Sequence, residues 1–249
     1  VADRKVHYRY AKSLKGPWTK PANDIFDGIA FYAGKTMSNG TERYLAGWCP
    51  TRIGDGDEDQ WGGSLVCHRM LFNADGTIDL KLPDGIDKKF TTLKKTVLID
   101  KSGKAVKKED SYVLSDVASV SFPRLDKTCK IEATVKATGN DDAFGFAFGA
   151  CDDKTEVYSI RFDLKNKQLV MSKDDLTRGT TPTQTNVALT VPADKLFKVK
   201  IVAEKSVCVM YVNDKIAFSN RIDKMPKNPW AIFTDKGTEI SFSDIKVYE

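Results

Sequence analysis

Two tryptophans bracket an acidic, glycine-dotted stretch near the start of the chain, in the sequence RYLAGWCPTRIGDGDEDQWGG (residues 43–63). Trp48 ends a run that reads as a β-strand, and the strand-like sequence resumes at Trp61. Between them, four of the five residues from Asp55 to Asp59 are acidic. An indole ring combines a broad apolar face with one polar N–H group, which suits an amphipathic ligand. The stretch therefore has two interpretations: a solvated hairpin, or the rim of a binding site.

The cysteines and histidines of this chain do not show the spacing of a metal site or of a nucleophile–base pair. The five cysteines include no CxxC pair, so the spacing typical of a zinc site is missing. Buried cysteines commonly act as small hydrophobic residues, and four of these five lie in apolar strand-like runs. His68 directly follows Cys67, and adjacent strand residues point to opposite faces, so the two are not a nucleophile–base pair. We expect structural roles for His68 and for the other histidine, His7.

Composition indicates a globular protein of one large or two ordinary domains. The chain has 249 residues, of which 41% are hydrophobic and 10% aromatic, values that exclude disorder. No apolar run approaches the roughly 18 residues of a membrane helix. The net charge of +5 is spread out, and the densest lysine cluster (residues 101–108) is followed by Glu109 and Asp110. Nucleic-acid binding would need clustered basic residues on one face, so we expect no nucleic acid and no membrane as partners.

The pattern of alternating short strands and turn residues predicts an all-β chain in two units. In the first unit, residues 1–85, expected strands at 6–10, 29–35, 43–48, 64–72 and 77–82 are separated by turns such as Asn39-Gly40. Residues 86–110 read as a connecting segment. Residues 111–249 hold about ten strands, a spacing typical of a β-sandwich. Its expected core comprises Phe144, Phe146, Tyr158, Ile160, Val199, Ile201, Val209, Tyr211 and Trp230.

Several motifs occur in a familiar order. The first unit contains LKGPW (14–18), FDGIAFYAGKT (26–36), RYLAGW (43–48), WGGSL (61–65) and ADGTIDLKLP (74–83). The second contains EKSVCVMYVNDKIAFSNRI (204–222), with Glu204, Ser206, Tyr211, Val212, Asn213 and Arg221 in matching positions. Together these motifs resemble the C-terminal part of glycoside hydrolase family 32, which includes invertases, inulinases and levanases. The resemblance implies the last one to two blades of a five-bladed β-propeller, followed by a β-sandwich.

The resemblance also implies candidate site residues. In a propeller, loops on one face surround a central pocket, where Trp48 and Trp61 would pack against sugar rings. Their alternative role is to anchor the packing between strands. Asp27 resembles a family position near the pocket, where it would bind or orient the substrate; its alternative is a turn aspartate before Gly28. The resemblance further implies an extracellular or periplasmic location, and we expect no cofactor and no metal.

The family's catalytic motifs are missing from this sequence. A retaining glycosidase needs two carboxyl groups roughly 5–5.5 Å apart. In the family they lie in Asn-Asp-Pro-Asn and Glu-Cys-Pro or Glu-Asp-Pro motifs, with a further aspartate in Arg-Asp-Pro. No Asp or Glu here precedes a proline, so we identify no catalytic residue in this chain.

Two functional hypotheses follow. In the first, the chain completes the pocket of a glycoside hydrolase acting on fructose-containing or related saccharides, and an N-terminal propeller polypeptide carries the catalytic carboxylates. The start at Val1 fits a processed or cut piece, and residues 1–85 would supply about one and a half blades. The second hypothesis is a non-catalytic carbohydrate-binding β-sandwich. A purely structural interaction module is a third, weaker interpretation.

Overall fold

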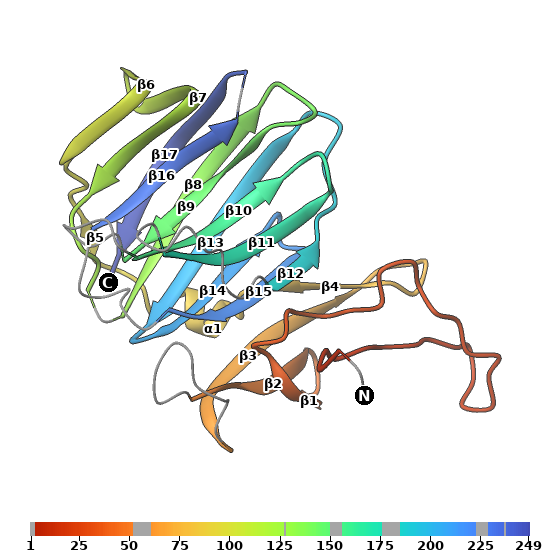
Figure 1. Cartoon of the computed structure of the whole chain (residues 1–249). Helices are drawn as coiled ribbons and strands as arrows, with labels where there is room; N and C mark the ends of the chain where they lie inside the picture. Colours follow the sequence, from red (N-terminus) through yellow and green to blue (C-terminus); the bar gives the residue numbers. More distant parts are fainter. Residues whose placement is uncertain are drawn as a thin grey trace.

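The chain is an all-β protein, as predicted. A computed structural model describes residues 3–51, 61–126, 128–149, 156–175, 185–222, 229–236 and 238–249. A small antiparallel sheet from the first third of the chain lies against a larger two-layered sandwich (Figure 1). Within the described ranges the only helix is a single turn, α1 (Asp84–Asp87), and none is long and apolar enough to cross a membrane.

Four strands form the small sheet. Both of its outer hairpins turn on glycines in the left-handed region, which residues with a Cβ disfavour: Gly40 has φ +102° and Gly76 has φ +87°. Asn39 stabilises the first turn by accepting hydrogen bonds from the backbone of Thr41 and Glu42. The strands are paired in sequence order: β1 (Tyr32–Ser38), β2 (Arg43–Pro50), β3 (Gly63–Phe72) and β4 (Ile78–Lys81).

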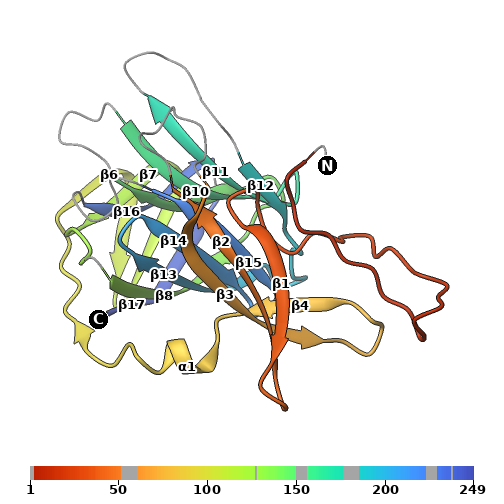
Figure 2. The same ribbon diagram turned by 90° about the horizontal axis from the view of Figure 1, so that it is seen from below.

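The expected strand at residues 6–10 does not join this sheet. It forms only two isolated bridges, between His7 and Ile25 and between Tyr10 and Thr19. The first unit therefore holds one four-stranded sheet, the number of strands in one propeller blade. Residues 3–31 run along the molecule as an extended excursion, seen as the projecting red segment in Figure 2.

The sandwich consists of two layers joined by one long strand. The first layer is β12 (Thr185–Ala188), β11 (Gln168–Asp175), β10 (Glu156–Asp163), β9 (Ala143–Phe148) and β16 (Trp230–Lys236), in that order. The second layer is β17 (Ile240–Tyr248), β8 (Thr128–Ala137), β13 (Leu196–Glu204), β14 (Val207–Val212) and β15 (Ile216–Arg221).

The strand that joins the layers is β7 (Ser111–Phe122). Its first part pairs with β17 and its last part with β16, so it passes from one layer to the other. The change of layer occurs beside Asp116, whose φ is +54°, and the facing strand is irregular at Gly103 and Lys104. An ion pair of 2.7 Å between Lys104 and Asp116 spans the bend.

The connecting segment expected at residues 86–110 belongs largely to the sandwich. Strand β5 (Leu93–Lys94) pairs with β17, and strand β6 (Asp100–Lys108) pairs with β7 along its whole length. The sequence concealed β6 because nearly all its side chains are exposed and five of its nine residues are charged. Charged, lysine-rich sequences are typical of edge strands, which must avoid pairing with other chains.

All nine residues expected in the sandwich core are buried, but they belong to two different cores. Seven lie between the sandwich layers. Val209 and Tyr211 lie in a second cluster, between the sandwich and the small sheet. The reason is that β14 is buried on both faces: Cys208, Met210 and Val212 point into the sandwich, and alternate residues point outward to the small sheet.

The second core binds the two units together. From the small unit it contains Phe26, Phe31, Leu45, Cys49, Val66, Met70, Leu80 and Leu82; from the sandwich it contains Val207, Val209, Tyr211 and Ala217. The two units are therefore one packed body across this contact.

Candidate functional site

A buried polar network lies within the contact between the two units. The Asp27 carboxylate, 1% exposed, accepts hydrogen bonds from the backbone N–H groups of Gly28 (2.6 Å) and Ser219 (2.7 Å). It also accepts one from the Ser219 hydroxyl at 2.6 Å and contacts His68 Nε2 at 3.0 Å. Burying an ionised carboxylate is costly unless such partners replace its water. Asp27 is thus held by four donors, three from residues remote in the sequence.

His68 continues the network to the sandwich. Its Nδ1 lies 3.0 Å from the hydroxyl of Tyr211, and its ring packs 5.0 Å from that of Phe31. Burial, and then the nearby Asp27 carboxylate, raises the pKa of Tyr211 well above its ordinary value, so its hydroxyl keeps its proton as a donor. Both hydrogen bonds of His68 form together when its Nε2 carries the proton and donates to Asp27, and its Nδ1 accepts from the Tyr211 hydroxyl.

This trio of Asp, His and Ser does not form a catalytic triad. In a triad the serine hydroxyl bonds to the histidine, whereas the Ser219 hydroxyl bonds to the Asp27 carboxylate. His68 and Ser219 are also 0% exposed, so no substrate reaches them in this structure. The network joins the small sheet to the sandwich.

Arg221 forms a second polar connection between the units. From the end of β15, its guanidinium donates to the backbone carbonyls of Pro50 (2.6 Å) and Cys49 (2.8 Å) at the end of β2. It also donates to the hydroxyls of Ser206 and Ser64. The planar guanidinium carries several donors in fixed directions, which lets one side chain hold a whole strand end.

A third connection attaches α1 to the sandwich. Asp87 lies 2.5 Å from the ammonium of Lys130 and 2.8 Å from that of Lys200. Burial by itself would raise the pKa of Asp87, but the hydrogen bonds from the two lysines outweigh it and lower that pKa.

The opposite face of the small sheet carries the predicted tryptophans. Trp48 packs edge-on against Tyr32 with ring centroids 5.3 Å apart, and Trp61 lies edge-on to the same ring at 6.4 Å. We call Tyr32, Trp48 and Trp61 the aromatic cluster. Trp48 is half-buried, whereas Trp61 is 89% exposed. Leu65, the cross-strand neighbour of Trp48, is 78% exposed. The cluster therefore offers ring surface to a binding partner.

The three predicted site residues thus lie in two different places. The structure brings Trp48 and Trp61 together, through Tyr32, which sequence reasoning did not single out. It places Asp27 in the buried network instead of on an open surface. The acidic loop lies outside the described residues, which resume at Trp61. No group of three or more His, Cys, Asp or Glu residues suited to a metal ion occurs in the described part of the chain.

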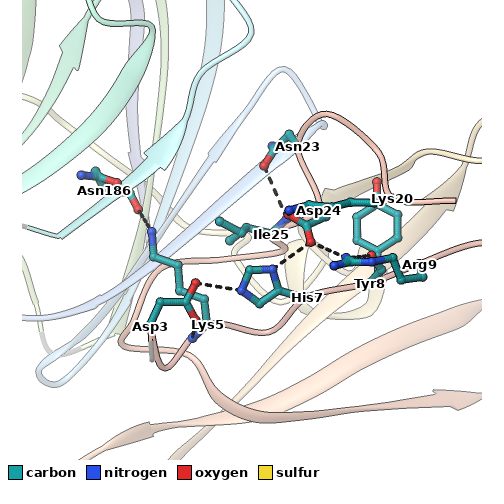
Figure 3. Close-up of polar contacts among 10 residues, drawn as sticks. All are labelled: Asp3, Lys5, His7, Tyr8, Arg9, Lys20, Asn23, Asp24, Ile25 and Asn186. Carbon is teal, nitrogen blue, oxygen red and sulfur yellow. Dashed lines mark hydrogen bonds and ion pairs between the residues drawn. The ribbon is translucent and has the colours of Figure 1, made fainter. Parts of the chain in front are cut away.

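A separate charged cluster fixes the extended N-terminal segment (Figure 3). At its centre is Asp24, whose side chain is 6% exposed and lies 2.9 Å from Nδ1 of His7. Arg9 also donates to Asp24, and Asp3 lies 2.8 Å from the other ring nitrogen of His7. Burial would raise the pKa of Asp24, but the hydrogen bonds from His7 and Arg9 lower it to about 2. Hydrogen bonds to Asp24 and then Asp3 raise the pKa of His7 above 6.5.

We expect the attachment of this segment to be strongest in mildly acidic solution. The contribution of Asp24 is present above its unfolded pKa of 3.8 and is lost as the pH falls toward 2. The contribution of His7 is complete below its unfolded pKa of 6.5 and is lost as the pH rises through its higher folded value. Hydrogen exchange of residues 5–10, corrected for intrinsic rates, should show most protection between about pH 4.5 and 6. A His7→Gln variant should lose the alkaline decline; an unchanged decline would contradict this assignment.

Sequence reasoning missed Ser219, the partner that Asp27 contacts through two atoms. A signal was present: Ser219 and Asn220 directly follow the apolar residues 216–218 in β15, and buried polar groups require partners. The structure also explains the motif residues of 204–222. Ser206 binds Arg221, Tyr211 reaches His68, and Asn213 accepts a hydrogen bond from the backbone of Lys198 at 2.7 Å.

Comparisons with known proteins agree with the resemblance. The family model described as GH32, BT1760-like, C-terminal domain matches residues 76–247. No curated protein sequence matches the chain. Similar solved structures include a fructosyltransferase from A. japonicus (TM-score 0.67, 14% identity, 98% of this chain and 49% of that one). An exo-inulinase from Aspergillus awamori has a TM-score of 0.67 at 15% identity and covers 98% and 50%.

A sucrose-6-phosphate hydrolase from Lactobacillus gasseri is also similar, with a TM-score of 0.57, 16% identity and coverage of 93% and 44%. At such identities the similarity shows a shared fold. The chain spans about half the length of these solved structures.

Proposed function

The chain belongs to the GH32, BT1760-like, C-terminal domain family, and on that premise we propose that it completes a glycoside hydrolase acting on fructose-containing saccharides. In this proposal the small sheet is the last blade of a β-propeller. The sandwich holds that blade in position through the Asp27 network and Arg221. The catalytic carboxylates belong to a preceding propeller part, in the same precursor or in a separate polypeptide.

The observation that carries this proposal is the difference between the two faces of the small sheet. One face is sealed by the sandwich, with Phe31 and Leu45 at most 1% exposed. The other face leaves Trp61, Leu65 and Met37 between 52% and 89% exposed. Propeller blades cover each other's faces by radial repetition, and an exposed apolar patch indicates an interaction surface. A neighbouring blade would cover most of this face, with the aromatic cluster at the pocket rim.

The proposal can be tested by activity and by mass. The isolated chain, verified by intact mass, should not hydrolyse sucrose, inulin or levan, because it lacks the family's carboxylate motifs. Material purified from the source organism should contain a second polypeptide, or a longer precursor, and should hydrolyse at least one of them. Turnover by the isolated chain would contradict the proposal. Sugar binding by a chain that never associates with a catalytic part would favour the carbohydrate-binding alternative.

In the complete enzyme we expect Trp48→Ala to lower kcat/KM by roughly tenfold, through loss of about 1.4 kcal/mol of ring contact with the substrate. Trp18→Ala is the matched control, because Trp18 is 57% exposed and lies outside the aromatic cluster. Steady-state kinetics and a melting curve should be recorded for both variants. If Trp48→Ala lowers the melting temperature and leaves kcat/KM unchanged, Trp48 is a packing residue instead of a substrate contact.

A further inference from the structure

A hollow of about 210 Å³ lies between the N-terminal segment, the small sheet and the sandwich, away from the aromatic cluster. Its walls come from four separate stretches of chain: residues 21–26, 77–80, 187–190 and 215–216, together with Tyr8. We propose that this hollow is a binding site for one ring of a neutral saccharide. The site goes beyond the proposed function, because it shares no residue with the aromatic cluster or the Asp27 network.

Polar side chains from every wall stretch of the hollow remain available to a ligand: Asn23, Thr190 and Lys215 are exposed and Asp79 is half-buried. Among the described residues, the Asp79 carboxylate, the Thr190 hydroxyl and the Lys215 ammonium make no side-chain hydrogen bond or ion pair. The amide nitrogen of Asn23 is equally free, since only its oxygen accepts a bond, from Ile25 N–H at 3.4 Å. These groups come from all four wall stretches. A few polar groups beside apolar side chains are typical of small-molecule sites.

The types of these groups favour a ligand rich in hydroxyls. The carboxylate of Asp79 only accepts hydrogen bonds and the ammonium of Lys215 only donates them. The free amide nitrogen of Asn23 donates, and the hydroxyl of Thr190 can do both. Sugar hydroxyls both donate and accept, so one ring can satisfy all four. Tyr8, Phe26 and Ile216 add apolar surface for the C–H groups of the ring.

The charges around the hollow favour a neutral ligand. Asp79 and Lys215 bring one negative and one positive charge to the same hollow. The opposite charges offset each other, so the hollow selects for an ion of neither sign, whereas a neutral polar ligand can form hydrogen bonds with both groups. Burial raises the pKa of Tyr8, the hydrogen bond from Ile78 N–H lowers it, and the negative charge of Asp79 raises it further.

The size of the hollow limits the ligand to one ring. A cavity of about 150 Å³ is known to hold benzene, so about 210 Å³ accommodates a five- or six-membered sugar ring with its hydroxyls. The rest of a longer saccharide would have to extend into solvent.

The walls of the hollow are held in place before any ligand arrives. Tyr8 stacks on Phe26 with centroids 4.6 Å apart, and its hydroxyl accepts a hydrogen bond from Ile78 N–H at 3.2 Å. Leu80 N–H donates to the Lys215 carbonyl at 3.0 Å, which joins the small sheet to the sandwich. The Asp24 cluster shown in Figure 3 fixes the segment that carries Asn23. Such preorganisation lowers the entropic cost of binding.

The experiment uses the full 249-residue chain and ligand-observed NMR with D-fructose, D-glucose and sucrose as neutral probes. D-gluconate serves as the anionic probe and D-glucosamine as the cationic probe. We expect at least one neutral sugar to bind with a millimolar Kd, and Asp79→Asn and Lys215→Met each to weaken it at least tenfold. Asp214→Asn is the matched control, because Asp214 is exposed and adjoins Lys215 without lining the hollow. Melting curves check that each variant folds.

Each result has one meaning. Weakening by Asp79→Asn and Lys215→Met, with Asp214→Asn unchanged, supports the site. Binding that is lost in Trp48→Ala and kept in Asp79→Asn would place the sugar at the aromatic cluster and overturn the inference, while leaving the proposed function intact. Absence of binding by every neutral sugar, or tighter binding of D-gluconate or D-glucosamine, would also overturn it. Inactivity of the complete enzyme would contradict only the proposed function.

Discussion

Replacing Asp27 with alanine should lower the free energy of unfolding by about 3–5 kcal/mol, the usual cost of removing one partner from a buried charged group. The substitution removes the acceptor of four hydrogen bonds and leaves Ser219 N–H, Gly28 N–H and His68 Nε2 buried without it. Urea denaturation, monitored by circular dichroism, measures the change in the free energy of unfolding. Because the network joins the two units, hydrogen exchange should increase most in β1–β4.

Two variants make this expectation specific. Asp27→Asn keeps the shape and one carbonyl oxygen, but its NH₂ group faces donors, so we expect it to cost roughly half as much as Asp27→Ala. Asp110→Ala is the control, because Asp110 is exposed in a turn; a surface change of this kind should stay within about 0.5 kcal/mol. A loss below about 1 kcal/mol for Asp27→Ala would show that the network does not hold the units together.

Replacing Arg221 with methionine should lower the free energy of unfolding by about 2–4 kcal/mol. The side chain donates to two backbone carbonyls at the end of β2, and hydrogen bonds from a charged group contribute about 1.5–3 kcal/mol each. Methionine retains the apolar stem, so the measured difference reports the lost guanidinium and not lost packing. Arg221→Lys should recover only part of the loss, because an ammonium cannot reach both carbonyls in the same fixed geometry.

The control for Arg221 is Arg124→Met, since Arg124 is exposed on the segment before β8. Equal effects of the two substitutions would mean that the connection through Cys49 and Pro50 contributes nothing to stability. If both Asp27→Ala and Arg221→Met act as expected, their double variant should lose less than the sum, because both break the same contact between units.

These two connections give the sandwich a defined role in the proposed enzyme. They attach to different parts of the small sheet: the Asp27 network reaches the middle of β3 at His68, and Arg221 reaches the end of β2. Two attachments restrict rotation of the small sheet against the sandwich as well as separation of the two. The aromatic cluster on the far face is then held in a fixed orientation toward whatever covers it.

The sequence by itself determined the fold class, the strands with clear alternation and the family. Period-2 alternation in β8, β10 and β13 reflects one buried and one less buried face, and the glycine turns ended the hairpins of the small sheet where expected. It also indicated Trp48 and Trp61 as neighbours of a possible site, because large aromatic residues at strand ends stand out locally.

Only the tertiary structure decided what covers each face. Asp27 followed by Gly28 reads locally as a turn, and its partner Ser219 lies 192 residues away, so no local pattern links them. Strand β6 stayed hidden because an exposed edge strand carries no apolar alternation. Val209 and Tyr211 were correctly expected to be buried, but burial on the outer face of β14 depends on a second unit packing there. Side-chain periodicity specifies which residues share a face, whereas long-range packing alone specifies the surface that this face meets.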